Sequence, residues 1–373
     1  MRLSGKLFDP GRGFTDGELC LEGGKIVRQA GGETYDLHDC YIIPGLTDLH
    51  FHGCVGADVS DGDAEGLQKM ADYELSRGVT QICPAGMTLE EDQLVKVCAN
   101  VAHHAATATS GAELVGINLE GPFLSEAKKG AQNGAWLRKP DLALLKKLCE
   151  VSNGLVKLVS VAPELEGALE FIEGAKELCG VSVAHTTANY DTALAAFQAG
   201  ARQVTHLYNA MPPFAHRDPG VIGAAADSAE VRCEIISDGV HIHPAVIRAT
   251  FRMMGKHRMV LVSDTMRAAG LSDGEYTLGG QAVTVKGRLA TLADGVIAGS
   301  ATDLMSCMVS AVHFGVPLAS AVIAAAVNPA KALGIYDRVG SLDIGKDANI
   351  AVLNPDLSLK AVIFRGEVVQ GAL

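Results

Sequence analysis

Two histidines separated by one residue, His50 and His52, stand at the end of an apolar segment. On an extended strand, side chains two residues apart point to the same face, so both imidazoles can reach one metal ion. The alternative is a half-buried strand that carries two hydrogen-bonded histidines. The pair alone does not decide between these interpretations, and a metal site needs further ligands from elsewhere in the chain.

Five more residues with metal-binding or acid-base side chains end short apolar runs: Glu120, His185, His206, Asp238 and Asp264. A carboxylate at the end of a buried strand favours a nearby cation, and two neutral imidazoles on neighbouring strands suit a divalent metal. Asp264 is of the type that takes a proton from a metal-activated water and returns it to a leaving group. Each has a structural alternative, such as a helix cap or a carbonyl-bonded histidine. Their repeated position at strand ends predicts a catalytic metal site.

Short apolar runs alternate with longer helical stretches through the middle of the chain, which is the pattern of βα units around a parallel sheet. We expect eight strands, at residues 41–50, 79–84, 113–120, 156–163, 181–185, 202–206, 233–238 and 259–264. A doubly wound sheet has the same local pattern. The polar strand ends favour a (β/α)₈ TIM barrel within the α/β class, because a barrel gathers the C-terminal ends of its strands around one rim.

The two ends of the chain have a strand-like pattern without a helical period. Gly23 and Gly24 separate two short β-rich runs and predict a hairpin, and residues 348–370 alternate β-rich runs with turns. Both ends are expected to meet in one small domain. The predicted division is a β-sandwich domain of residues 1–43 and 336–373 and a barrel of residues 44–335.

Composition narrows the class of partner and compartment. The formal net charge of -12 argues against nucleic acid, whose phosphates require clustered Lys and Arg, although a few local cations can still hold a small anion. Nine scattered Cys without a C-x-x-C pair argue against a disulfide framework and fit a reducing cytoplasm. No apolar run is long enough to predict a membrane span. We therefore expect a cytoplasmic protein without nucleic-acid or membrane partners.

Several longer motifs resemble the amidohydrolase superfamily and, within it, the N-acetylglucosamine-6-phosphate deacetylases. The most specific of them is THLYNAM with a following HRDPG, at residues 205–220 within a longer matching segment of residues 183–224. The resemblance also rests on PGLTDLHFHG (44–53), NLEGPFLSEAKKGAQN (118–133), SDGVHIHP (237–244), LVSDTMRAAGLSDGEYTLGGQ (261–281), VIAGSATDL (296–304) and NPAKALGI (328–335). These motifs cover most of the chain.

The resemblance implies a barrel with a β-sandwich built from both termini, a divalent metal such as Zn²⁺ or Fe²⁺, and a phosphorylated N-acetyl amino sugar as substrate. It makes Glu120, His185 and His206 the main metal ligands, and His50 with His52 the support of a second ion. One or two ions per subunit are therefore open. Asp264 becomes the general acid and base in hydrolysis of the N-acetyl amide to acetate and glucosamine 6-phosphate.

The substrate contacts implied by the resemblance are Ala131, Gln132, Asn209, Ala210, Arg217, His241, Ile297, Ala298 and Gly299. Arg217 would meet the phosphate, in the family from the neighbouring subunit of a homodimer, and its alternative is a surface arginine. Some members have His where this chain has Gln132, so the acetyl carbonyl needs another electrophile, which a second ion at the H-x-H pair would supply. Cys54 is expected to be a buried, inert thiol.

Three rival functions stay open at this point. An N-acetylgalactosamine-6-phosphate deacetylase differs only in the orientation of one substrate hydroxyl. A cyclic-amide hydrolase of the dihydroorotase kind would bridge its metals with a carboxylated lysine near strand four, where Lys157 stands at the wrong end. A metal-free scaffold barrel would be expected to have lost the ligands that this sequence keeps.

Overall fold

The computed structural model describes all 373 residues. Eight parallel strands form a closed barrel, as predicted: β5 (Leu46–Asp48), β8 (Val79–Ile82) continued by β9 (Ala85–Gly86), β10 (Glu113–Leu114) continued by β11 (Ile117–Phe123), β12 (Val156–Val161), β13 (Gly180–Val183), β14 (Gln203–Val204), β15 (Arg232–Ile236) and β16 (Met259–Val262). The barrel closes between its first and last strands. There the Asp264 N–H donates to the His50 carbonyl at 2.9 Å and the His52 N–H to the Thr265 carbonyl at 2.8 Å.

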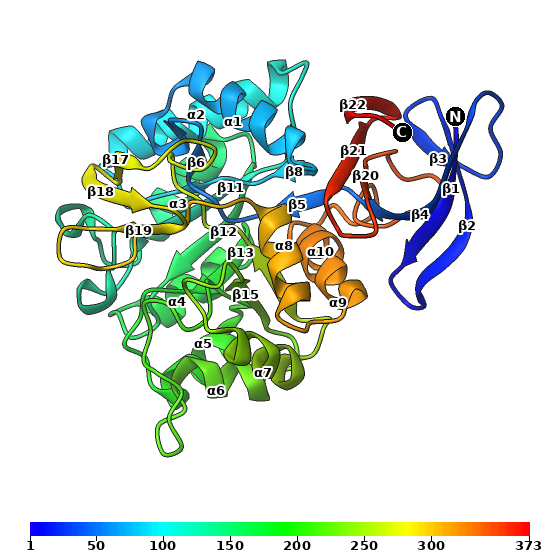
Figure 1. Ribbon diagram of the computed structural model, residues 1–373. Coiled ribbons are helices and arrows are strands. Elements are labelled where there is room, and N and C mark those ends of the chain that lie inside the picture. The colour runs from blue at the N-terminus through cyan, green and yellow to red at the C-terminus, as the bar shows by residue number, and fades with distance from the viewer.

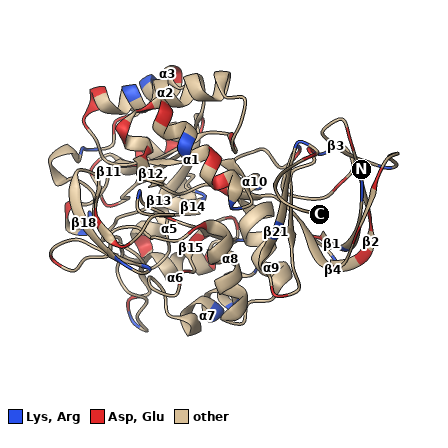
Figure 2. Ribbon diagram, turned by 45° about the horizontal axis from the view of Figure 1, so that its top comes forward, with Lys and Arg blue, Asp and Glu red and all other residues tan.

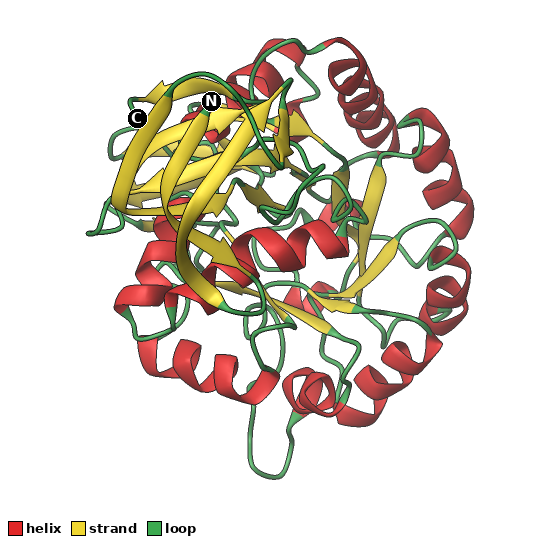
Figure 3. Ribbon diagram, turned by 90° about the vertical axis from the view of Figure 1, so that its right-hand side faces the viewer, coloured by secondary structure: helices red, strands yellow, loops and turns green.

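One helix follows each barrel strand, and together the helices form a ring outside the strands (Figure 3). They are α1 (Ala64–Ser76), α2 (Glu91–Thr107), α3 (Leu142–Val151), α4 (Ala168–Ala175), α5 (Tyr190–Ala199), α6 (Gly220–Asp227), α7 (Pro244–Met254) and α8 (Leu304–His313), with α9 (Leu318–Val322) and α10 (Asn328–Ala332) after them. Side-chain caps set several starts: Asp63, Asp141 and Asp303 each accept a backbone N–H of the first turn. None of the helices has the length and apolar character needed to cross a membrane.

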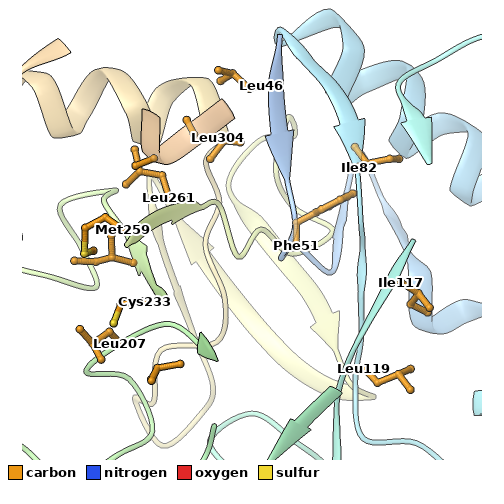
Figure 4. Close-up of a cluster of buried hydrophobic side chains, with 14 of the residues drawn as sticks. Leu46, Phe51, Ile82, Ile117, Leu119, Leu207, Cys233, Met259, Leu261 and Leu304 are labelled. Carbon is orange, nitrogen blue, oxygen red and sulfur yellow. The ribbon is translucent and has the colours of Figure 1, made fainter. Parts of the chain in front are cut away.

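Apolar side chains fill the layer between strands and helices (Figure 4). Strands such as β16 are buried along their whole length, because a parallel sheet is covered on both faces. Leu333, after α10, packs with Leu49 and Val260 in a separate small cluster. Lys, Arg, Asp and Glu are interspersed over the ribbon (Figure 2).

Both termini contribute to one seven-stranded sheet beside the barrel (Figure 1). Its strands are β1 (Arg2–Asp9), β2 (Gly13–Glu22), β3 (Lys25–Val27), β4 (Thr34–Pro44), β20 (Ile350–Leu353), β21 (Leu359–Phe364) and β22 (Glu367–Gly371). The predicted hairpin is confirmed, since β2 pairs with β3 around Gly23 and Gly24. Ile350 and Val352 face a core of twelve buried residues from both chain ends, whereas Ala351 and Leu353 face the barrel core. The division at residues 43 and 336 stays a prediction, because β20 packs on both cores.

A small three-stranded sheet lies at the end of the barrel opposite the terminal sheet (Figure 1). It consists of β17 (Gly274–Leu278), β18 (Gln281–Lys286) and β19 (Leu289–Thr291) and is called the flap below. Its inner side chains Leu278, Val283 and Val285 pack with Met87 and Met266 from the rim loops. The short strands β6 (Gly53–Cys54) and β7 (Ala57–Asp58) form a hairpin after the H-x-H pair.

Candidate functional site

The strand-end residues named from the sequence converge on one rim of the barrel. His50 and His52 follow β5, Glu120 lies in β11, and His185, His206 and Asp264 come directly after β13, β14 and β16. The last three have positive φ angles of 41°, 28° and 48°. Such backbone conformations are uncommon for residues other than glycine and cluster at functional sites, where the surrounding fold holds them.

Glu120 is at the centre of the first group of potential ligands. Its Oε1 lies 2.9 Å from the Nε2 of His185 and 2.9 Å from the Nε2 of His206, and these two nitrogens are 3.2 Å apart. All three side chains are buried. Three potential ligand atoms therefore surround one point.

His50, His52 and Asp264 form a second group beside the first. The Nε2 of His52 is 3.2 Å from Asp264 Oδ1 and 3.2 Å from Glu120 Oε2, and the Nε2 of His50 is 3.6 Å from Asp264 Oδ1. Because its two oxygens face different groups, Glu120 lies between two potential cation positions.

The hydrogen bonds behind the histidines indicate that the cluster suits a cation. The Nδ1 of His185 is 2.8 Å from the Lys128 carbonyl oxygen, and that of His52 is 2.9 Å from the Ala85 carbonyl oxygen. A carbonyl oxygen only accepts, so Nδ1 carries the hydrogen and a neutral imidazole presents the lone pair of Nε2 to the carboxylates. Lone pairs facing carboxylate oxygens at about 3 Å repel each other unless a proton or a metal ion lies between them. Buried atoms without a hydrogen-bond partner, among them His50 Nε2 and Asp264 Oδ1, fit the same interpretation.

Mutual attraction favours the charged forms of His50 and Asp264 despite their burial. Burial opposes the imidazolium form of His50, but the carboxylates of Glu234 and Glu120 raise its pKa to about 9. Burial also opposes ionisation of Asp264, yet hydrogen bonding to His52 and the charge of His50 bring its pKa below the usual value. Asp264 is therefore ionised at neutral pH, as a proton acceptor must be.

A cavity of about 480 Å³ opens above the cluster and contains most of the predicted substrate contacts. They are Ala131, Gln132, Asn209, Ala210, His241, Ile297 and Gly299, together with His52, Glu120, His185, His206 and Asp264. The flap closes one side of the cavity with Leu278, and Gln281 donates to the Ala131 carbonyl at 2.6 Å. A volume of this size matches a small-molecule site.

Three named residues lie elsewhere. His50 is fully buried behind His52 rather than in the cavity wall. Ala298 does not line the cavity, because its side chain packs into the apolar cluster under the flap. Arg217 is exposed on the loop of residues 212–219, which projects from the molecule between β14 and α6 (Figure 1), and it does not line the cavity of its own chain.

Gln132 is held in place by two hydrogen bonds. Its Nε2 donates to Glu120 Oε2 at 2.7 Å, and its Oε1 accepts the Thr88 N–H at 2.7 Å. The amide hydrogen bonds thus orient the central carboxylate. Cys54 is buried outside the cavity, and burial raises the pKa of its thiol, so it is an unreactive side chain.

His241 reaches the cavity from the loop after β15. Its Nδ1 lies 2.8 Å from Asp238 Oδ2, which follows the same strand. Burial opposes the imidazolium, but this carboxylate raises the pKa of His241 above its usual value. The contact with Asp238 therefore favours the cationic form of this imidazole.

Sequence reasoning missed Glu234, which lies inside β15 and contacts His50 Nδ1 at 2.8 Å. The signal in the sequence was a lone acidic residue within the apolar strand CEIISD. Its side chain is fully buried without a Lys or Arg partner, so it belongs to the surroundings of the cluster.

The sequence profile of the Amidohydrolase family matches residues 41–369. The chain therefore belongs to the amidohydrolase family. The predicted class, a metal-dependent hydrolase on a TIM barrel, is confirmed by this membership and fold. The family implies a divalent metal. The two groups of potential ligands described above are the places where this chain could hold such an ion.

Within the family, the relatives of known activity confirm the resemblance to N-acetylglucosamine-6-phosphate deacetylases. The chain is 39% identical to that enzyme from Bacillus subtilis, over 88% of this chain and 85% of the relative. It is 34% identical to an N-acetylgalactosamine-6-phosphate deacetylase from Escherichia coli O157:H7, over 88% of both chains. A mutant N-acetyl-D-glucosamine-6-phosphate deacetylase from Mycobacterium smegmatis, in complex with N-acetyl-D-glucosamine-6-phosphate, superposes with a TM-score of 0.93 at 32% identity, over 99% of each chain.

Proposed function

We propose that this protein hydrolyses the N-acetyl amide of N-acetylglucosamine 6-phosphate, giving acetate and glucosamine 6-phosphate. The observation that carries the proposal is the convergence of Glu120, His185, His206 and Asp264 on the floor of one cavity. Relatives with this activity extend over most of the chain. The same chemistry with the galactose epimer is the second candidate, because one relative has that activity.

Glu120, His185 and His206 would hold one divalent ion, and His50, His52 and Asp264 a second one. We propose Zn²⁺ or Fe²⁺, since imidazole and carboxylate ligands suit both. When bound, such an ion supplies an electrophile for the acetyl carbonyl and makes water more acidic. Gln132 is not the carbonyl's electrophile in this proposal, because its amide N–H already donates to Glu120.

Asp264 would move the proton during the reaction. Its carboxylate accepts a proton from the water that attacks the acetyl carbon, and the resulting acid donates that proton to the amine nitrogen as the C–N bond breaks. One water is consumed, and the acetyl group leaves as acetate. Its ionised state at neutral pH and its place in the cavity wall support this role.

The cavity residues would orient the sugar phosphate. Asn209, Ala210 and His241 line the cavity and would bind the phosphate end. From the loop of residues 297–299, Ile297 and Gly299 would pack against the sugar. The proposed phosphate contact of Arg217 requires a neighbouring subunit, because this side chain does not line the cavity of its own chain. We therefore propose a homodimer, and the cytoplasmic location stays a prediction.

Two rival functions receive no support from the site. Lys157, the candidate for a carboxylated bridge of a cyclic-amide hydrolase, is near the start of β12, beside Gly116, and does not line the cavity. A metal-free scaffold would have no reason to keep a buried cluster of four histidines and two carboxylates, whose burial costs stability.

The test measures acetate release from N-acetylglucosamine 6-phosphate, its galactose epimer and unphosphorylated N-acetylglucosamine. It also measures ring opening of dihydroorotate, a cyclic amide whose hydrolysis yields no acetate. Elemental analysis of the same preparation gives the metal content. We expect turnover of the first compound to exceed that of the others, with at least one divalent ion per chain. Preference for another compound, or a metal-free protein that gains nothing from added Zn²⁺ or Fe²⁺, would refute the proposal.

A further inference from the structure

Glu234 is a fully buried carboxylate in the middle of β15, with its side chain turned toward the barrel interior. It receives three hydrogen bonds. His50 Nδ1 lies 2.8 Å from Oε2, the His206 N–H donates to the same oxygen at 3.3 Å, and Gln203 Nε2 donates to Oε1 at 2.5 Å. No Lys or Arg lies within salt-bridge distance of it, so its charge is balanced only through His50.

The contact with Glu234 fixes how His50 faces the cluster. A carboxylate only accepts hydrogen bonds, so Nδ1 of His50 carries a hydrogen and Nε2 turns toward Glu120 and Asp264, at 3.6 Å from an oxygen of each. This Nε2 is buried and has no hydrogen-bond partner. A histidine held by a carboxylate in this way is an oriented and more basic metal ligand.

The two ligand groups differ in what stands behind their histidines. In the first group, His185 is held by the neutral carbonyl of Lys128, and the Nδ1 of His206 has no partner. In the second group, His52 is held by the neutral carbonyl of Ala85, and His50 alone is held by a carboxylate. Among the four histidine rings, Glu234 therefore holds only that of His50, and its contact with the first group is the longer bond of 3.3 Å from the His206 backbone N–H.

We propose that Glu234, oriented by Gln203, is the positioning residue for His50 and thereby determines whether a second divalent ion binds at His50, His52 and Asp264. The inference shares with the proposed function only the premise that the cluster binds metal. Loss of the hydrogen-bond acceptor for His50 at residue 234 weakens binding of the second ion and leaves the first ion bound. Loss of such an outer hydrogen bond lowers metal affinity by about 10- to 100-fold.

The test uses Zn²⁺ titration of the metal-stripped full-length protein, with bound zinc counted by elemental analysis. In Glu234→Gln, an amide oxygen turned toward His50 places the new N–H₂ group opposite the N–H₂ group of Gln203. These two donors repel each other, and this disturbs the position of the oxygen that accepts from His50. The double variant Gln203→Glu with Glu234→Gln restores a donor opposite an acceptor and leaves a carbonyl oxygen for His50. We expect the unmodified protein to bind two ions. The affinity for the second ion should be about 10- to 100-fold lower in the single variant, and the double variant should recover most of it.

Four results would overturn the inference: a single ion in the unmodified protein, unchanged second-ion affinity in Glu234→Gln, equal weakening of both ions, or no recovery in the double variant. Equal weakening would indicate a purely structural role for Glu234, and the first ion thus reports on folding within each sample. Acetate release by the unmodified protein is measured separately. A protein that binds two ions but releases no acetate would sink the proposed function and leave this inference standing.

Discussion

Glu74, in the last turn of α1, is a carboxyl group that is buried without a hydrogen-bond or salt-bridge partner. Its side chain is 0% exposed, and neither of its oxygens has a hydrogen-bond partner. The nearby Arg77 is bound to Asp303 at 2.9 Å. Burial, together with the negative charge of Asp48, raises the pKa of Glu74 well above its usual value.

This pKa shift makes the native protein less stable as the pH rises. Between the pKa of Glu74 in the unfolded chain, about 4.3, and its higher pKa in the native protein, the native state binds more protons than the unfolded state. The free energy of unfolding then falls with pH by up to about 1.4 kcal/mol per pH unit for this group. Glu74→Gln has nearly the same shape and no charge, so it removes this loss. From pH 5.5 to 7.5, the variant should gain up to about 2.7 kcal/mol relative to the unmodified protein.

The assay is urea unfolding at pH 5.5, 6.5 and 7.5, each with the same excess of Zn²⁺. Glu173→Gln is the matched control, because Glu173 is an exposed glutamate in α4. The control should follow the pH dependence of the unmodified protein, whereas the stability difference of Glu74→Gln should grow steadily with pH. A difference that stays constant over this range, or that shrinks, would refute the assignment of a protonated, buried Glu74.

Three further predictions concern the site. Asp264→Asn should lower kcat by about 10²- to 10⁴-fold, because the proton acceptor of the reaction is lost. Elemental analysis of the variant should still find the ion that Glu120, His185 and His206 would hold. A near-normal kcat would exclude Asp264 as the base. Metal binding should release protons from His50, whose carboxylate neighbours raise its pKa to about 9. Calorimetric Zn²⁺ titration in buffers of different ionisation enthalpy measures that release, and heat independent of the buffer would contradict it. Arg217→Ala should raise KM for the phosphorylated sugar by about tenfold, which corresponds to roughly 1.4 kcal/mol. The melting temperature should not change, because the Arg217 side chain is exposed. An unchanged KM would show that Arg217 does not contact the phosphate.

The barrel could be predicted because its strands are buried on both faces. Such strands appear in the sequence as short apolar runs, and each of the eight expected runs contains or overlaps an observed strand. The flap was not recognised as a sheet, although its residues 274–281 belong to a quoted motif. Its strands β17 and β18 are only partly buried, and their inner residues pack on Met87 and Met266, which lie in rim loops outside the flap. No periodic pattern of apolar residues in the local sequence indicates such a contact.

The candidate site was predictable where chemistry coincided with a strand end. Glu120, His185, His206 and Asp264 could be named because a polar residue terminated each apolar run. Glu234 escaped because it lies within its strand, where a single acidic residue has no local partner, and its role depends on His50, 184 residues away. Ala298 was named from a motif that places a loop but does not say which of its three residues faces inward.

The distribution of buried charge explains why the rim of this barrel suits a cation. Eight buried carboxyl groups stand against one buried Lys or Arg side chain, Lys346, which contacts Tyr336 and Val339. Burial raises the pKa of Asp48 to about 7 and, together with the charge of Asp48, raises the pKa of Glu74, so both groups tend to hold protons. Glu120 and Asp264 respond in the opposite way, because the histidines around them lower the pKa of both carboxyls despite burial. Negative charge is therefore concentrated where six potential ligands meet, and a divalent ion can replace the protons on the histidines there.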